Sequence, residues 1–243
     1  MLNFMQADKK GPAQAGKLYL GVDTCGVTGS TALARCGNDS FQLLGQIEMD
    51  GRNCSSLLVS SIGELLAQAG LTLAALDGIV AVYGPGSFTG VRIGLSAVKG
   101  IAEATQLPVV AVSRLEVMTA SAGVPAAAID AHRHEIFLRF METATESTER
   151  LAGAEELAEI VAPAQVAICD EAAAALLSDS WPNTELVRVP APTAAAAIQL
   201  CAPRLATGER VDVAQLDGYY LRRSDAEIFG EPSAPPRNGA THA

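Results

Sequence analysis

One short stretch of this 243-residue chain places glycines beside hydroxyl side chains at a spacing that could hold an anion. A glycine-proline-glycine turn at 84–86 follows the apolar, β-branched run 79–83 and precedes Ser87 and Thr89. In α/β proteins, a strand, a glycine turn and a helix start present backbone N–H groups to an anion. The same residues suit a plain turn in which Ser87 or Thr89 caps the helix, and we expect this structural role. The Gly-Lys-Ser/Thr ending of a Walker loop is missing.

A second candidate is the carboxylate that ends the apolar run 18–22. Asp23 is followed by Thr24 and Thr28, and a carboxylate beside hydroxyl groups could hold Mg²⁺ through water next to a phosphate. A similar strand end at Asp130 is followed by a turn without glycine, whose N–H groups cannot easily surround a phosphate. We therefore expect Asp23 to be a turn or cap carboxylate. The candidates for nucleotide binding are Asp23, Thr24, Ser87 and Thr89.

Other chemistries lack the side chains that they need. His132 and His134 are two residues apart, which on a strand supplies only two metal ligands, so we expect no metal site. The five cysteines are scattered and form no CxxC pair, as in proteins with reduced thiols, and no histidine lies near Cys54 in the sequence to activate it. Ser87 has no visible His/Asp partners. We expect no catalytic residue.

Composition and charge narrow the class of protein. Hydrophobic residues make up 49% of the chain and charged residues 18%, as in a folded α/β protein. The formal net charge of −10 argues against a nucleic-acid-binding module, because phosphate contacts need clustered Lys and Arg, so RNA would be reached only through a partner. No apolar run reaches the roughly 18 residues of a membrane span, and the N-terminus lacks a signal-peptide core. We expect a cytoplasmic protein without membrane contact.

The elements that would position these residues alternate along the chain. In the first half, the pattern predicts strands and helices in the order strand 18–22, strand 30–36, strand 41–49, helix 55–69, strand 79–83, helix 89–103, strand 108–112 and helix 114–122. In the second half, it predicts strand 126–129, strand 135–142, helix 154–160, strand 166–169, helix 171–178, strand 186–189 and a helix from 193. We expect Pro203 to kink or end that last helix.

The two halves repeat one theme: a strand ending on Asp, a turn, a second strand, then alternating helices and strands. This duplication predicts an α/β fold with two subdomains, each a mixed sheet flanked by helices. The expected division is a flexible leader at 1–16, subdomains at 17–112 and 113–223, and a flexible tail at 224–243.

The helix predicted at 89–103 has an unusually small and apolar face. At 100° per residue, Arg92 lies on a narrow polar stripe, and small or apolar residues occupy the rest of the surface. We expect this surface to pack on the sheet and also to serve a partner, together with the helix at 55–69. An apolar patch of this kind rarely stays free, so a homodimer is expected when the chain is alone. The predicted interface residues are Leu58, Ile62, Gly90, Val91, Arg92, Gly94, Leu95, Ala97, Val98 and Ile101.

The segment 84–94, GPGSFTGVRIG, closely resembles the signature of the TsaB family of tRNA threonylcarbamoyladenosine biosynthesis proteins. The segments GVDT at 21–24, IDAHRHEIF at 129–137 and YYLRR at 219–223 fall where that family carries similar sequences. The chain departs from the family at Cys54-Ser55, where a His-Ser step is usual, and at Gly218, where a proline is usual. The resemblance covers about residues 17–223.

The resemblance implies an actin-like ATPase (ribonuclease H-like) fold and a paralogue of the catalytic subunit TsaD that has lost catalysis. It further implies partners, namely a TsaD-like subunit and a TsaE-like ATPase, which together transfer threonylcarbamoyl to the adenosine next to the tRNA anticodon. Cofactors are expected to be none for the isolated chain, with ATP or ADP only at a composite site with the partner. The alternative is a small-molecule kinase or ATPase of the same superfamily, which predicts Mg-ATP binding that depends on Asp23.

Overall fold

A computed structural model describes residues 16–37, 40–143 and 146–222. Its first sheet contains β1 (Lys17–Asp23), β2 (Thr28–Cys36), β3 (Phe41–Asp50), β4 (Gly78–Val82) and β5 (Val109–Val112), in the order β3-β2-β1-β4-β5. The first three strands pair antiparallel, and β1, β4 and β5 pair parallel, so the sheet is mixed. The central strands β1 and β4 are almost wholly buried, as their continuous apolar sequences require of strands covered on both faces.

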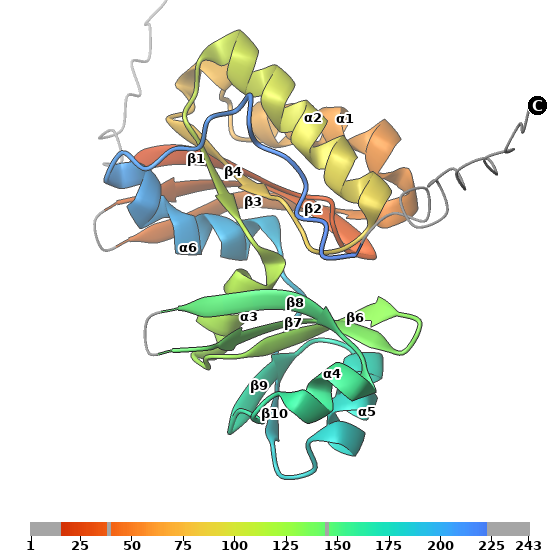
Figure 1. The fold of residues 1–243 in the computed structure, drawn as a ribbon. Helices are drawn as coiled ribbons and strands as arrows, with labels where there is room; N and C mark the ends of the chain where they lie inside the picture. Colours follow the sequence, from red (N-terminus) through yellow and green to blue (C-terminus); the bar gives the residue numbers. More distant parts are fainter. Residues whose placement is uncertain (1–15, 38–39, 144–145, 223–243) are drawn as a thin grey trace, which may run out of the picture.

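Helices cover both faces of this first sheet (Figure 1). On one face lie α1 (Cys54–Gln68), which follows the short 3₁₀ turn η1 (Gly51–Asn53), and α2 (Phe88–Thr105); a second 3₁₀ turn, η2 (Leu73–Ala75), follows α1. On the other face lies α6 (Ala194–Ala206), which packs against β1, β2, β4 and β5. A Cβ on Gly21 of β1 would stand 2.7 Å from the carbonyl oxygen of Ala194, so only glycine lets α6 approach the sheet so closely.

The second sheet repeats the topology of the first. It contains β6 (Ala127–His132), β7 (Glu135–Met141), β8 (Ser147–Ala152), β9 (Gln165–Ile168) and β10 (Glu185–Arg188), in the order β10-β9-β6-β7-β8. Strand for strand, β6 to β10 match β1 to β5, which confirms the predicted duplication and the α/β class. The flanking helices are α3 (Arg114–Ala122), α4 (Ala154–Glu159) and α5 (Glu171–Ser180).

Two elements differ from the sequence prediction. Strand β8 was not predicted, because its sequence STERLA is polar and mostly half-buried at the edge of the sheet. Helix α6 does not end at Pro203 but continues to Ala206, since a proline in the last turn removes only one backbone donor. The predicted tail at 224–243, and the leader apart from Gly16, lie outside the described residues.

The lobes built on the two sheets are joined by more than one connection. Helix α3 of the second lobe packs against α6 of the first, and Arg204 of α6 forms an ion pair with Glu116 of α3 at 3.4 Å. Residues 207–222, which we call the C-terminal strap, then run along the first lobe, where the N–H of Val211 donates to the carbonyl of Val109 on edge strand β5. Helix α6 and much of the strap therefore pack with the first lobe, although the division at 112/113 assigns them to the second.

Within the described residues, no helix combines the length and apolar character that crossing a bilayer would require.

Candidate functional site

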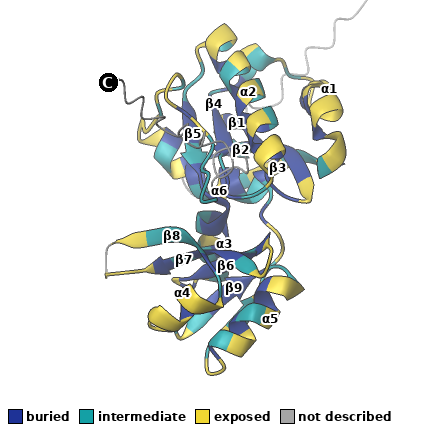
Figure 2. Cartoon of the chain, turned by 45° about the vertical axis from the view of Figure 1, so that its right-hand side comes forward, coloured by how far each residue is buried: buried dark blue, intermediate teal, exposed yellow. Residues whose placement is uncertain are grey.

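An apolar groove runs between α1 and α2 on the outer side of the first lobe. It encloses about 370 Å³ and is lined by Val59, Ile62, Gly63 and Leu66 of α1, Leu73 of η2, and Ser96, Ala97, Gly100 and Ile101 of α2. Ser96 alone among these carries a polar side chain. Val59 is 74% exposed, and Figure 2 shows much of the outer surface of α1 in the exposed colour. The groove is therefore an open apolar surface.

Two glycines in the groove have no internal reason to be glycine. A Cβ on Gly63 or on Gly100 would meet nothing within 4 Å. Each sits inside a regular helix, where glycine costs about 1 kcal/mol relative to alanine. A glycine that leaves space on the outside of a helix lets a second molecule come close to the backbone. These two positions widen the groove at a cost to the stability of the isolated chain.

The predicted interface residues are distributed over both faces of the two helices. Ile62, Ala97 and Ile101 line the groove, and Arg92 is exposed at the start of α2. Ile62 is nevertheless buried within the chain itself, and so are the remaining six, namely Leu58, Gly90, Val91, Gly94, Leu95 and Val98. Sequence analysis missed Val59, Gly63 and Gly100, although a glycine in the middle of each of two amphipathic helices was a signal that could have found them.

The first turns of α2, and Gly86 just before them, pack closely on the turn that follows β1. A Cβ placed on Gly86 would stand 2.1 Å from the carbonyl oxygen of Cys25. On Gly90 it would stand 2.0 Å from the carbonyl oxygen of Thr24, and on Gly94 it would stand 2.3 Å from Oγ1 of Thr24. Real Cβ atoms do not approach so closely, so the glycines of the GPGSFTGVRIG segment serve an internal contact. Close packing on this turn explains the spacing of Gly86, Gly90 and Gly94.

Hydrogen bonds within the chain occupy several of the groups that could have held an anion there. The Ser87 hydroxyl accepts from the N–H of Gly90 at 3.2 Å, which confirms the predicted cap, while Thr89 is exposed in the first turn. The Ser87 N–H donates to the carbonyl of Cys25 at 2.8 Å, and the Thr24 hydroxyl donates to the carbonyl of Gly90 at 2.6 Å. The helix start is thus tied to the β1 turn through Ser87 and Gly90, although residues 87–89 are exposed.

The carboxylate of Asp23 is fully buried beneath this contact. Its Oδ1 accepts from the Cys25 N–H at 2.8 Å, and its Oδ2 lies 3.7 Å from Nε of Arg114. Burial raises the pKa of the Asp23 carboxyl above its usual range, and the Arg114 guanidinium acts against that rise. A side chain of the protein, not open space, therefore faces the carboxylate that would contact Mg²⁺ in an ATPase of this topology.

The second turn is also occupied by its own side chains. His132, Arg133 and His134 all adopt left-handed backbone angles, with φ near 60°, although none is a glycine. Oδ1 of Asp130 accepts a hydrogen bond from the backbone N–H of His132 at 2.8 Å. Oδ2 of Asp130 lies 2.8 Å from Nδ1 of the His132 ring. Because both turns bind their own chain, the described residues do not fit a magnesium-bound nucleotide.

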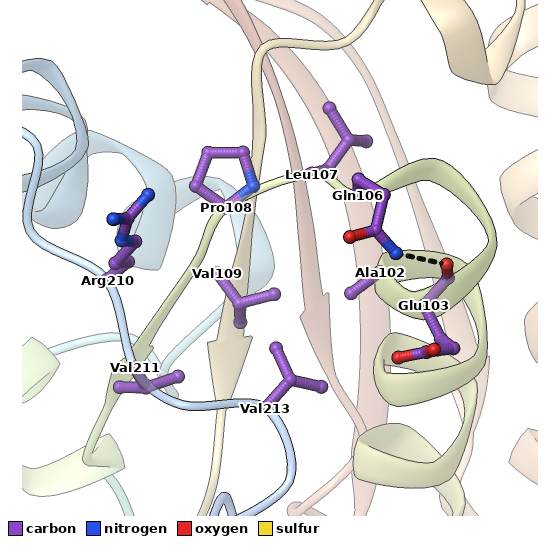
Figure 3. A pocket seen from close by; sticks show the side chains of 9 residues that line it. All are labelled: Ala102, Glu103, Gln106, Leu107, Pro108, Val109, Arg210, Val211 and Val213. Atoms are coloured by element: carbon purple, nitrogen blue, oxygen red, sulfur yellow. Dashed lines mark hydrogen bonds between the residues drawn. The ribbon is translucent and has the colours of Figure 1, made fainter.

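A smaller hollow of about 280 Å³ lies between the end of α2 and the C-terminal strap (Figure 3). Its floor is apolar, with Val109, Val211 and Val213, and its polar members are Glu103, Gln106 and Arg210. The Gln106 amide already donates to the backbone carbonyl of Glu103 at 2.7 Å, as the dashed line in Figure 3 shows.

Among the described residues, no His, Cys, Asp or Glu side chains form a group of three that could hold a metal. The Cys54 thiol is buried, and burial raises its pKa above the usual range.

Comparison with known proteins agrees with this geometry. The family model of tRNA N6-adenosine threonylcarbamoyltransferase, TsaD, matches residues 48–194. The tRNA threonylcarbamoyladenosine biosynthesis protein TsaB of Haemophilus influenzae is 36% identical over 96 residues, 37% of this chain and 41% of that protein. TsaB of Escherichia coli is 32% identical over 124 residues, 49% of this chain and 52% of that protein. The chain thus aligns with only about half, or less, of these curated relatives.

A solved structure extends the likeness over the fold. The crystal structure of a Pseudomonas aeruginosa protein with similarity to peptidase YeaZ superposes with a TM-score of 0.68 and 27% identity, covering 85% of this chain and 100% of that one. The family model covers more than half of the chain, and the duplicated mixed sheets agree with the solved fold. The chain therefore belongs to the tRNA N6-adenosine threonylcarbamoyltransferase family and to its TsaB group, with the actin-like ATPase (ribonuclease H-like) fold.

Proposed function

We propose that this protein is a non-catalytic subunit in the biosynthesis of threonylcarbamoyladenosine on tRNA, and that the groove between α1 and α2 binds a TsaD-like catalytic subunit. The observation that carries the proposal is the groove itself, with an exposed Val59 and two interior glycines that serve no internal contact. An apolar surface between two helices suits a partner's amphipathic helix, whose apolar face would fill it.

The names of the relatives supply the pathway. Two matched proteins are called TsaB, and another, from Ruegeria, is called tRNA N6-adenosine threonylcarbamoyltransferase and is 43% identical over 68 residues. With a net charge of −10, this chain is poorly suited to hold tRNA directly, so the tRNA is contacted through the partner. A TsaE-like ATPase joins the same assembly, and any ATP or ADP binds at a composite site with the partner.

The occupied turns support the absence of catalysis in this proposal. Thr24, Cys25 and the start of α2 bind one another, and Asp23 faces Arg114. The alternative, a small-molecule kinase or ATPase, requires these groups to bind Mg-ATP, and would require the helix start to move away from the β1 turn.

The same groove explains the proposed homodimer of the isolated chain. Two copies related by a twofold axis would each cover the other's apolar groove, which an isolated chain leaves in water. The partner subunit and the second copy then compete for one surface.

Charged substitutions in the groove test the proposal. Val59→Glu together with Ala97→Glu would bury two charges in an apolar interface, and we expect affinity for the TsaD-like subunit to fall on the order of 100-fold, measured by calorimetric titration. The homodimer should dissociate in sedimentation experiments. The matched control is Leu57→Glu with Lys99→Glu, at positions on the same helices that lie outside the groove. Equal binding by both variants, with folding intact, would refute the proposed interface.

A further inference from the structure

A buried ion pair joins the two lobes at the centre of the molecule. Asp23, at the end of β1, has none of its surface exposed, and Arg114, the first residue of α3, is 5% exposed. Oδ2 of Asp23 and Nε of Arg114 lie 3.7 Å apart, and neither atom has a hydrogen-bond partner. The contact is thus one of opposite charges rather than a geometrically fitted hydrogen bond.

The guanidinium lies where the ends of strands from both lobes converge. Its Nη2 would be 2.8 Å from a Cβ on Gly26, in the turn after β1. The backbone N–H of Arg114 donates to the carbonyl of Gly84, after β4, at 2.7 Å. On the second lobe, burial raises the pKa of the Cys169 thiol, next to β9, and the charge of Arg114 acts against that rise. The positive charge therefore acts on both lobes.

A buried carboxylate needs a positive charge beside it, because an isolated charge in a low-dielectric interior is strongly unfavourable. In an ATPase of this fold, a divalent cation bound with the nucleotide would supply that charge near the carboxylate at the end of β1. Here a side chain of the protein stands in that position. Arg114 therefore supplies at Asp23 the positive charge that a bound Mg²⁺ ion would otherwise supply.

We propose that the Arg114 guanidinium is a built-in cation between the lobes, which takes the place of a metal ion at Asp23 and holds the two lobes in one arrangement without nucleotide. Arg114 is a positioning residue in this role, since it acts on the lobes through Asp23. The Asp23–Arg114 pair lies outside the α1–α2 groove, so its role does not depend on the partner that fills the groove.

Thermal unfolding of the full chain with and without millimolar MgCl₂ tests the proposal. We expect the wild type and Arg114→Lys, which keeps a positive charge, to be unaffected by Mg²⁺. Arg114→Ala should unfold roughly 10 °C lower, and Mg²⁺ should recover part of that loss by entering the vacated space. Adding Asp23→Asn to Arg114→Ala should abolish the Mg²⁺ response. An Asp23-dependent Mg²⁺ shift in the wild type, or no shift in Arg114→Ala, would overturn the proposal.

A second pair of variants keeps the test decisive if Arg114→Ala does not fold. Arg114→Met keeps most of the side-chain volume but leaves Asp23 uncompensated, whereas Asp23→Asn with Arg114→Met removes both charges. Replacing both members of a buried ion pair is far less damaging than removing one. The double variant should therefore unfold at a higher temperature than Arg114→Met, and an equal or lower temperature would show that the two side chains are not charge partners.

Discussion

Two sides of α2, an inner one toward the β1 turn and an outer one toward the groove, use glycine for opposite purposes. On the inner face, Gly90 and Gly94 let the helix touch the β1 turn at distances that no Cβ would tolerate. On the outer face, Gly100 touches nothing, and neither does Gly63 across the groove on α1. The inner glycines allow close packing on the β1 turn, and the outer glycines keep a surface open. A glycine is therefore informative only once the space around its missing Cβ is known.

The strongest test of this contrast is a methyl group on the inner face. Gly90→Ala would place Cβ 2.0 Å from the carbonyl oxygen of Thr24, which is backbone and cannot rotate away. We expect the free energy of unfolding to fall by about 3 kcal/mol or more, because the helix start must separate from the turn. Urea unfolding monitored by circular dichroism measures this loss. An unchanged midpoint would show that the inner contact is loose.

A gentler change removes a hydrogen bond from the inner face while keeping the shape of the side chain. Thr24→Val deletes the hydroxyl that donates to the Gly90 carbonyl at 2.6 Å, and leaves that buried acceptor without this partner. The expected loss is about 1 to 3 kcal/mol, from the same urea experiment. Thr24→Ser, which keeps the hydroxyl, is the control and should retain more stability than the valine variant.

The sequence was sufficient for the fold but not for the division of α2 between its two neighbours. Period and turn signals predicted nearly every strand and helix, and the repeated strand–Asp–turn theme predicted the duplicated sheets. At 100° per residue, Gly90, Gly94, Ala97 and Ile101 lie on one face of α2, yet the β1 turn covers the first two and the groove takes the others, which lie further along the helix. An angle around a helix does not say which neighbouring element fills each part of the face.

Long-range pairs were beyond sequence reasoning for a similar reason. Asp23 was correctly singled out as a carboxylate at a strand end, but nothing in a single sequence connects it with Arg114, which is brought beside it only when α3 packs between the lobes. Strand β8 was missed because its polar, half-buried sequence lacks the apolar alternation of a core strand. Both are properties of tertiary packing.

The smallest expected effect has the opposite sign and tests the outer face. Gly63→Ala and Gly100→Ala add a methyl group where no atom lies within 4 Å, and alanine favours the helix. Each should raise the free energy of unfolding of the isolated chain by about 1 kcal/mol, measured at a protein concentration low enough to avoid dimers. The same substitutions should weaken partner binding, because the added methyl groups fill space that the partner enters. If alanine instead destabilised the monomer, these glycines would serve an internal contact like those of the inner face, and the contrast between the two faces of α2 would disappear.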